Sequence, residues 1–172
     1  MTMATTHSPR LENMEVAVPA AVVAQSRTAC AADPAAIGTA VGAAFQKIDA
    51  FVKTNAIATC GAPRVVYTEW SPTGVQFTAA VPIRDVPRGI RDTADVSIAV
   101  VPECSALRFV HHGPYREIRH TYDQIEAWLR ARGGIRSPAD WARYSPMWEE
   151  YLNDPTTTPE SELVTRIYLT LA

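Results

Sequence analysis

Two helix-start signals that lie 80 residues apart constrain the fold of this chain more than any other feature. Asp33-Pro34 offers an N-cap followed by a proline at the first helical position, and Gly113-Pro114 is typical of a strand-to-helix turn. Apolar residues then recur at steps of three and four, as on one face of an amphipathic helix. We expect one helix from Pro34 to about Asn55 and another from about Pro114 to the stop at Gly133-Gly134.

The segments around these helices are rich in β-branched and aromatic residues, which favour strands. One strand is expected from Val16 to about Ala29, before the first helix. Two strands at 63–70 and 75–83, separated by a Ser-Pro-Thr-Gly turn, should form a hairpin after it. The second helix should have its own strands at 95–101, 105–111, 147–152 and 164–171, with a loop that carries Trp141 before the last two.

The order strand–helix–strand–strand therefore occurs twice. This repeat predicts an α+β fold of two pseudo-duplicated strand–helix–strand–strand units, with two antiparallel sheet halves and a central cleft between them. We expect a flexible N-terminal tail at 1–14 and a single domain at 15–172, whose halves cover about 15–84 and 95–172.

Charge and cysteine content argue against several classes of function. The net charge is −2 with scattered Lys and Arg, so nucleic-acid binding is not expected. No apolar run is long enough to span a bilayer and no signal peptide is evident, which predicts a cytoplasmic protein without membrane contact. Cys30, Cys60 and Cys104 lack metal-ligand spacing and are expected to be reduced and partly buried; no metal or cofactor is predicted.

The second half contains an ordered set of short motifs. His111-x-Gly-Pro-Tyr115 precedes Tyr122 and Trp128-Leu129, and Glu149-x-Tyr-Leu-Asn-Asp-Pro155 precedes a final strand that opens at Thr165. In this order the motifs resemble the GyrI-like small-molecule-binding family, which also supplies the effector-binding half of several multidrug-responsive bacterial regulators. The first half resembles that family in its order of elements.

The resemblance implies an aromatic-walled pocket with a buried glutamate, which falls on Glu149, and ligands that are lipophilic and often cationic. The chain departs from the family in its last strand, where Thr165-Arg166-Ile167 replaces the common Thr-Glu-Ile. Arg166 then has three possible roles: it neutralises Glu149, it binds an anionic group of a ligand, or it points to solvent.

Strand alternation selects further candidates for the ligand site. Met147 and Tyr151 share a strand face with Glu149, and Tyr67 shares one with Glu69. In the last strand Ile167 and Leu169 should face a helix, while Arg166 and Tyr168 face the cleft. Two tryptophans are predicted to be packing residues: Trp128, which lies on the second helix beside Leu129, and Trp148, on the helix-facing side of its strand. Trp141 either covers the cleft mouth or packs at the surface. The remaining candidates are His111 and Tyr115.

Carboxylates are the catalytic groups that the sequence offers. Glu149, with its pKa raised by burial, and Glu69 as a second acid would activate water against a strained electrophile; the alternative for Glu69 is a solvated surface position. Three functions remain open: a stand-alone module that binds lipophilic aromatic and cationic compounds, a hydrolase on the same scaffold, and a protein-interaction domain that modulates DNA gyrase, as in one branch of the family. No protein partner is identified.

Overall fold

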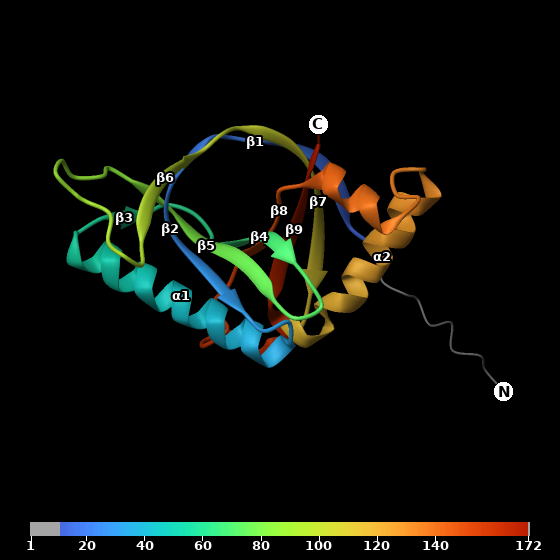
Figure 1. The fold of residues 1–172 in the computed structure, drawn as a ribbon, viewed down its shortest axis with the longest axis horizontal. Helices are drawn as coiled ribbons and strands as arrows, with labels where there is room; N and C mark the ends of the chain where they lie inside the picture. The colour runs from blue at the N-terminus through green and yellow to red at the C-terminus, as the bar shows by residue number, and fades with distance from the viewer. Residues whose placement is uncertain (1–10, 172) are drawn as a thin grey trace.

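The computed structural model describes residues 11–171, which form one curled antiparallel sheet with its helices along the outer side (Figure 1). The α-helices are α1 (Pro34–Thr54) and α2 (Ile118–Ala131), and short 3₁₀ turns occur at η1 (Tyr115–Glu117), η2 (Pro138–Tyr144) and η3 (Glu160–Glu162). The strands are β1 (Asn13–Val18), β2 (Ala21–Cys30), β3 (Ala58–Thr59), β4 (Arg64–Trp70), β5 (Val75–Arg84), β6 (Ser97–Val101), β7 (Cys104–His112), β8 (Met147–Tyr151) and β9 (Val164–Leu171).

The helix-start signal at Pro34 acts as expected from the sequence, whereas the signal at Pro114 is followed by a 3₁₀ turn before α2 begins. The Asp33 carboxylate accepts hydrogen bonds from the amides of Ala35 and Ala36 at 3.1 and 3.0 Å, so α1 begins at Pro34. After Pro114 the chain first makes the turn η1, and α2 begins four residues later than Pro114. It ends at Ala131, and Gly133 follows with a φ of 71°, a conformation that glycine adopts without strain.

The single strand predicted before α1 is in fact two strands, β1 and β2, separated at Pro19. The break is needed because the two pieces pair with different partners: β1 lies against β7, whereas β2 lies between β5 and β6. Pro102 separates β6 from β7 in the same way, which confirms the predicted break there. Proline suits both positions, since it has no N–H to donate to a ladder.

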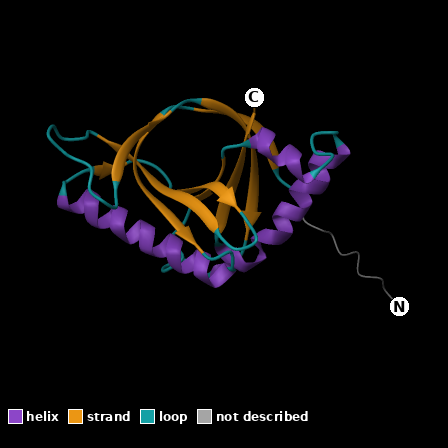
Figure 2. Cartoon of the chain, viewed as in Figure 1, coloured by secondary structure: helices purple, strands orange, loops and turns teal. Residues whose placement is uncertain are grey.

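The two halves are joined within one sheet, whose strand order is β1-β7-β9-β8-β4-β5-β2-β6, with β3 paired to β5. The α+β class is confirmed, but the halves do not cover one another as two separate sheets. They meet edge to edge where β8 pairs with β4, and the curl of the continuous sheet leaves α1 and α2 on the same outer face (Figure 2). Residues on that seam therefore lie between the two helices.

The two faces of the sheet have different cores. On the outer face, α1 packs against one cluster around Phe77 and α2 packs against another around Phe109. A third cluster contains no helix residue and holds Ala106, Trp148 and Tyr168, with Val66 packed against it. We call the face that carries this third cluster the inner face.

The N-terminal boundary differs from the predicted one by two residues. β1 begins at Asn13 and pairs with β7, whereas the sequence predicted a tail to residue 14; residues 1–10 lie outside the described residues. Between residues 11 and 171, no helix is both long and apolar enough to cross a membrane. Cys30 and Cys104 are partly buried and unpaired as expected, whereas Cys60 is exposed.

Candidate functional site

Glu149 lies at the seam between the two halves, on the outer face of the sheet. It occupies the middle of β8, directly opposite Val65 of β4 on one side and Ile167 of β9 on the other. The residue is only 5% exposed, although a carboxylate normally requires solvent or a cationic partner. Among the described residues, no Lys, Arg or His forms an ion pair with it.

Tyrosine hydroxyls take the place of a cation around this carboxylate. Tyr122 of α2 donates to Oε1 at 2.8 Å, and Tyr151 of β8 donates to Oε2 at 2.9 Å. Tyr67 of β4 lies close enough to Glu149 and to Tyr151 for each of them to affect the pKa of its hydroxyl. Three elements, drawn from both halves of the chain, thus converge on one buried acid.

Burial dominates the electrostatics of this group. Desolvation raises the pKa of Glu149 above the ordinary glutamate value, and the hydrogen bonds from the tyrosines oppose that rise only in part. Burial also raises the pKa of Tyr122 and of Tyr151 well above the ordinary tyrosine value, and the adjacent Glu149 charge acts in the same direction. The tyrosines therefore keep their protons and remain hydrogen-bond donors.

More aromatic side chains surround Tyr151. The ring of Tyr115 in η1 meets it edge-on with the centroids 5.4 Å apart, and Phe45 of α1 does so at 6.2 Å. Tyr67, the other tyrosine next to Glu149, makes a similar edge-on contact with Phe77, with the ring centroids 6.4 Å apart. Aromatic pairs favour edge-to-face contacts of this kind, so rings from α1 and η1 hold Tyr151 in place beside Glu149.

Replacing Tyr122 with Phe should destabilise the protein at neutral pH. The variant removes the hydrogen bond to Oε1 and leaves that carboxylate oxygen without its donor, which is worth about 1.5–3 kcal/mol for a charged acceptor. The pKa of Glu149 should rise further at the same time. Urea unfolding measures the first effect, and carbon-13 NMR of the Glu149 carboxyl carbon during a pH titration measures the second.

Tyr144→Phe is the matched control, because the Tyr144 hydroxyl makes no hydrogen bond within the described residues although its ring is buried. A loss of stability as large as that of Tyr122→Phe would contradict the assignment of a special role to the Tyr122 hydroxyl.

The structure brings together several of the residues that the sequence selected, namely Glu149, Tyr67, Tyr115, Met147 and Tyr151. Met147 stands opposite Tyr67 in the β4–β8 ladder and shares the outer face with Glu149. Glu69 is not part of this group. A bulge separates Glu69 from Tyr67, and its exposed carboxylate accepts a hydrogen bond from Gln76, which matches the solvated alternative.

Arg166 and Tyr168 lie on the inner face, away from Glu149. The β8–β9 register places Arg166 opposite Glu150 and Tyr168 opposite Trp148, so the suggested bridge between Arg166 and Glu149 does not form. The expectation that Trp148 faces a helix is also wrong. Its ring stacks on Tyr168 with the centroids 4.6 Å apart. The prediction that Ile167 and Leu169 face a helix is confirmed, since both pack in the cluster around α2.

His111 and Trp141 have packing roles in the structure. His111 is buried; its Nδ1 lies 2.8 Å from Thr121 Oγ1 and its Nε2 lies 3.1 Å from the Pro114 carbonyl oxygen. A carbonyl oxygen only accepts, so Nε2 donates to it, and both nitrogens serve to hold the start of α2. Trp141 packs edge-on against Tyr144 in η2, as in the surface-packing alternative.

Tyr122 is the site residue that the sequence reasoning missed, because its position in the apolar periodicity of α2 assigned it to the core. A phenol among aliphatic positions was the available signal, since a buried hydroxyl requires a partner. Across residues 11–171, no cluster of three or more His, Cys, Asp or Glu is arranged to hold a metal ion.

The curled sheet and the buried acid between two helices define an α+β domain with a candidate site between its two halves. The family model of the GyrI-like small molecule binding domain matches residues 18–172. The chain therefore belongs to the GyrI-like family, which confirms the resemblance seen in the sequence. A sequence search among curated proteins finds no match.

Solved structures share this fold at low sequence identity. EcmrR in its complex with DNA has a TM-score of 0.72 and 16% identity, over 92% of this chain and 56% of the EcmrR chain, so this chain spans about half the length of EcmrR. A hydrolase from Listeria innocua has a TM-score of 0.58 and 14% identity, over 96% and 94% of the two chains. SAV2435, solved with tetraphenylphosphonium bound, has a TM-score of 0.58 and 9% identity, over 94% of each. At these identities the likeness shows the fold alone.

Proposed function

We propose that this protein binds lipophilic, aromatic cations, with Glu149 as the counter-charge and the surrounding tyrosine rings as the walls of the site. One observation carries the proposal. Glu149 is a buried carboxylate that no described cation neutralises, and only neutral tyrosine hydroxyls bond to it. A buried charge in this state is costly, and a bound cation offsets that cost.

The chemistry of the walls supports a cation with aromatic substituents. Tyrosine faces attract cations through the ring quadrupole and present apolar area at the same time. SAV2435, which shares the fold, is solved with such a cation, tetraphenylphosphonium. This compound is therefore the first probe for the present chain.

Entry to the site requires side-chain movement, because Glu149 and the rings of Tyr122 and Tyr151 are packed together. Tyr115 is only partly buried and lies in the turn η1 rather than within α2. Its ring contacts Tyr151 at its edge, so displacement of Tyr115 exposes the ring next to Glu149. We assign to Tyr115 the role of the outermost wall.

The test is calorimetric titration with tetraphenylphosphonium and, as a neutral control of similar shape, triphenylphosphine oxide. We expect the cation to bind at least tenfold more tightly, because only the cation gains the attraction of a buried carboxylate. Equal affinities for the two compounds would overturn the role of Glu149 as the counter-charge, and absence of binding by both would overturn the proposed pocket.

Binding should also depend on pH in a direction that the pKa of Glu149 sets. Burial raises this pKa above the ordinary value of 4.5, and only the ionised carboxylate attracts a cation. Affinity for tetraphenylphosphonium should therefore be lost as the pH falls through the raised pKa, at a higher pH than an exposed glutamate would produce. Repeating the titration at half-unit steps of pH locates the midpoint.

The same geometry favours a second candidate function, the hydrolysis of a strained electrophile. A carboxylate with a raised pKa accepts a proton from water near neutral pH, so Glu149 can act as a general base. In that reaction the water oxygen bonds to an electrophilic ring carbon, a ring bond breaks, and the proton held by Glu149 passes to the released atom. Mass spectrometry of a cyclopropane-bearing electrophile after incubation separates the two functions. A gain of one water would indicate a hydrolase, and recovery of the unchanged compound with the protein would indicate binding.

A further inference from the structure

The inner face of the sheet carries several buried hydrogen-bond donors for which the described residues supply no acceptor. They are Nε and Nη2 of Arg64, Nε of Arg108 and Nε1 of Trp148. Arg64 is 5% exposed and Trp148 is 4% exposed, so water does not reach these groups freely. Unsatisfied buried donors are costly, and a set made up of donors only calls for an acceptor.

These donors come from three strands that lie near one another. Trp148 of β8 stands opposite Tyr168 of β9, and Tyr168 stands opposite Arg108 of β7. Arg64 of β4 is opposite Glu150, which is two residues from Trp148 on the same strand face. Val66, two residues after Arg64 on the same face of β4, stands opposite Trp148, so Arg64 adjoins this row.

The geometry of Arg64 is specific for one kind of acceptor. Nε–H and one Nη2–H lie along the same edge of a guanidinium and point in parallel, and both are unpartnered here. That edge matches the two oxygens of a carboxylate or a phosphate in a bidentate contact. Burial lowers the pKa of Arg64, and the nearby Glu150 charge opposes this, but the guanidinium stays charged in either case.

The charge of the surrounding inner face is positive. Arg166 and Arg64 flank Glu150 in one row, and Arg108 stands in the neighbouring row opposite Tyr168, so the inner face holds three arginines near this carboxylate. The Glu150 carboxylate accepts from the Tyr168 hydroxyl at 2.9 Å, and among the described residues none of the three arginines forms an ion pair within 4.0 Å. An added anion would therefore meet a net positive lining.

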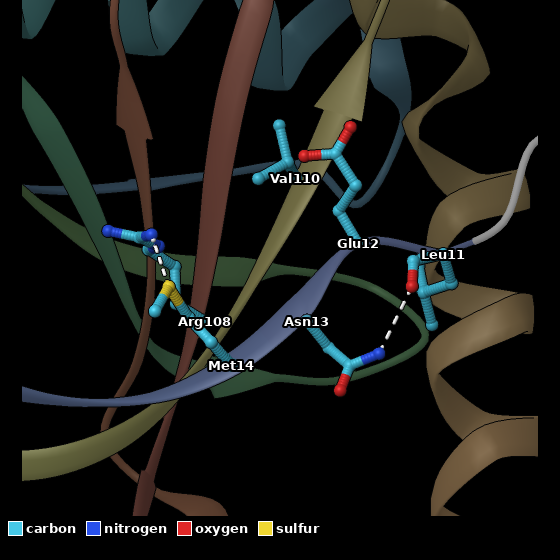
Figure 3. A pocket seen from close by; sticks show the side chains of 6 residues that line it. All are labelled: Leu11, Glu12, Asn13, Met14, Arg108 and Val110. Atoms are coloured by element: carbon cyan, nitrogen blue, oxygen red, sulfur yellow. Dashed lines mark hydrogen bonds between the residues drawn. The ribbon is translucent and has the colours of Figure 1, made fainter.

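A groove opens beside Arg108 at the edge of the sheet. Its volume is about 430 Å³, and Figure 3 shows the side chains that line it: Leu11, Glu12, Asn13, Met14, Arg108 and Val110. Arg108 Nη2 lies 2.6 Å from Met14 Sδ within this groove, while its Nε is unpartnered. Val110 stands opposite Arg166 in the β7–β9 ladder, so the groove adjoins the arginine row. Glu12, whose carboxylate lies 3.3 Å from His112 Nε2, is the one acid in its lining.

We propose that the inner face is a binding site for an oxyanion, a carboxylate or a phosphate group, held by the free edge of Arg64 with Arg108 and the indole N–H of Trp148. The site is separate from Glu149, which lies on the opposite face of the same strand, and it selects the opposite charge. Entry is through the groove at Arg108, where the partly exposed Arg108 and Arg166 side chains can move aside.

Nitrogen-15 NMR of the whole chain tests this site directly. The protein has four tryptophans, and Trp148→Phe assigns the Trp148 indole signal among them. Sodium phosphate, sodium acetate and phenyl phosphate are added in turn, each against sodium chloride at equal ionic strength. We expect the Trp148 Nε1–H and Arg64 Nε–H signals to shift downfield and to saturate with at least one oxyanion, while the signal of the exposed Trp70 does not move. The oxyanion that binds more tightly identifies a phosphate or a carboxylate ligand.

Two substitutions complete the test. Arg64→Met should weaken the saturating response at least tenfold, and Arg64→Lys should weaken it as well, since lysine keeps the charge but lacks the two-pronged edge. If the Arg64 variants do not fold, Arg108→Met supplies the same comparison. Arg84→Met, which removes an exposed arginine at the end of β5, should change nothing. Absence of saturation with all three anions, or the same loss in Arg84→Met, would overturn the proposal and would leave water as the partner of these donors.

Discussion

Replacing Glu149 with Gln should lower the affinity for tetraphenylphosphonium by a factor on the order of 100. Glutamine has nearly the same shape as glutamate. Its one amide oxygen accepts from one of the two hydroxyls, Tyr122 or Tyr151, and its NH₂ group donates to the hydroxyl oxygen of the other, so the loss reports mainly the charge. Removing one member of a buried charge pair costs about 2–5 kcal/mol, and about 1.4 kcal/mol corresponds to a factor of ten. The pH dependence of binding should disappear in the same variant.

The same substitution should raise the stability of the ligand-free protein at neutral pH, although it lowers the affinity for the cation. Because the folded state raises the pKa of Glu149, the native protein binds its proton more tightly than the unfolded chain does. Stability contributed by this proton is fully present below the unfolded pKa and is lost as the pH rises through the folded pKa. Glu149→Gln should therefore melt at a higher temperature than the parent at pH 7, with the difference decreasing toward pH 4.

Glu150→Gln is a matched control for both measurements. The neighbouring carboxylate has the same chemistry, but it lies on the inner face and is bonded to Tyr168. Glu150→Gln should therefore leave the affinity for the cation within about twofold of that of the parent protein. Unchanged binding by Glu149→Gln, or an equal loss in both variants, would show that the charge of Glu149 is not what holds the ligand.

Local patterns were enough to predict the elements that surround this site. The start of α1 at Pro34, the turn that follows Pro114, the hairpin at 63–83 and the shared face of Glu149 and Tyr151 follow from local signals. These signals are capping, turn chemistry and the alternation of a strand, all of which act between near neighbours. The resemblance to the GyrI-like family comes from the ordered motifs of the second half, and the family model over residues 18–172 confirms it. These features together lead to Glu149 without knowledge of the tertiary structure.

Long-range register was beyond the reach of the same patterns. Alternation divides β8 into two sets but does not say which set faces the helices, and both sets contain an aromatic and a glutamate. The strand register then decides the neighbours: Ile167, and not Arg166, stands opposite Glu149. The choice of the wrong set in β8 puts Trp148 toward a helix and Glu149 beside Arg166, whereas Trp148 shares the inner face with Arg166 and Glu149 lies on the outer face. Tyr122 was missed for a different reason, since periodicity does not distinguish a hydroxyl-bearing ring from an aliphatic core residue.

Replacing Ile125 with Ala should reduce the free energy of unfolding by about 2–5 kcal/mol, the usual range for deleting a fully buried aliphatic side chain. Ile125 is 0% exposed and packs with Phe109 and Ile167 beneath α2. Urea unfolding measures the change. It should remain a single transition, because the two halves share one continuous sheet across the β4–β8 seam.

Ile37→Ala is the control for this change, since the same atoms are removed from a partly buried position on α1. Its loss should be clearly smaller, because less apolar area leaves water at that position on folding. Equal losses would mean that Ile125 is packed no more tightly than Ile37. Two separate transitions would mean that the halves fold independently.

The stability of α2 also affects the candidate site. Tyr122 reaches Glu149 only while α2 is packed on the sheet. Ile125 itself makes no hydrogen bond to the carboxylate, whose donors are Tyr122 and Tyr151. A variant that loosens α2, such as Ile125→Ala, should therefore lose cation affinity together with stability.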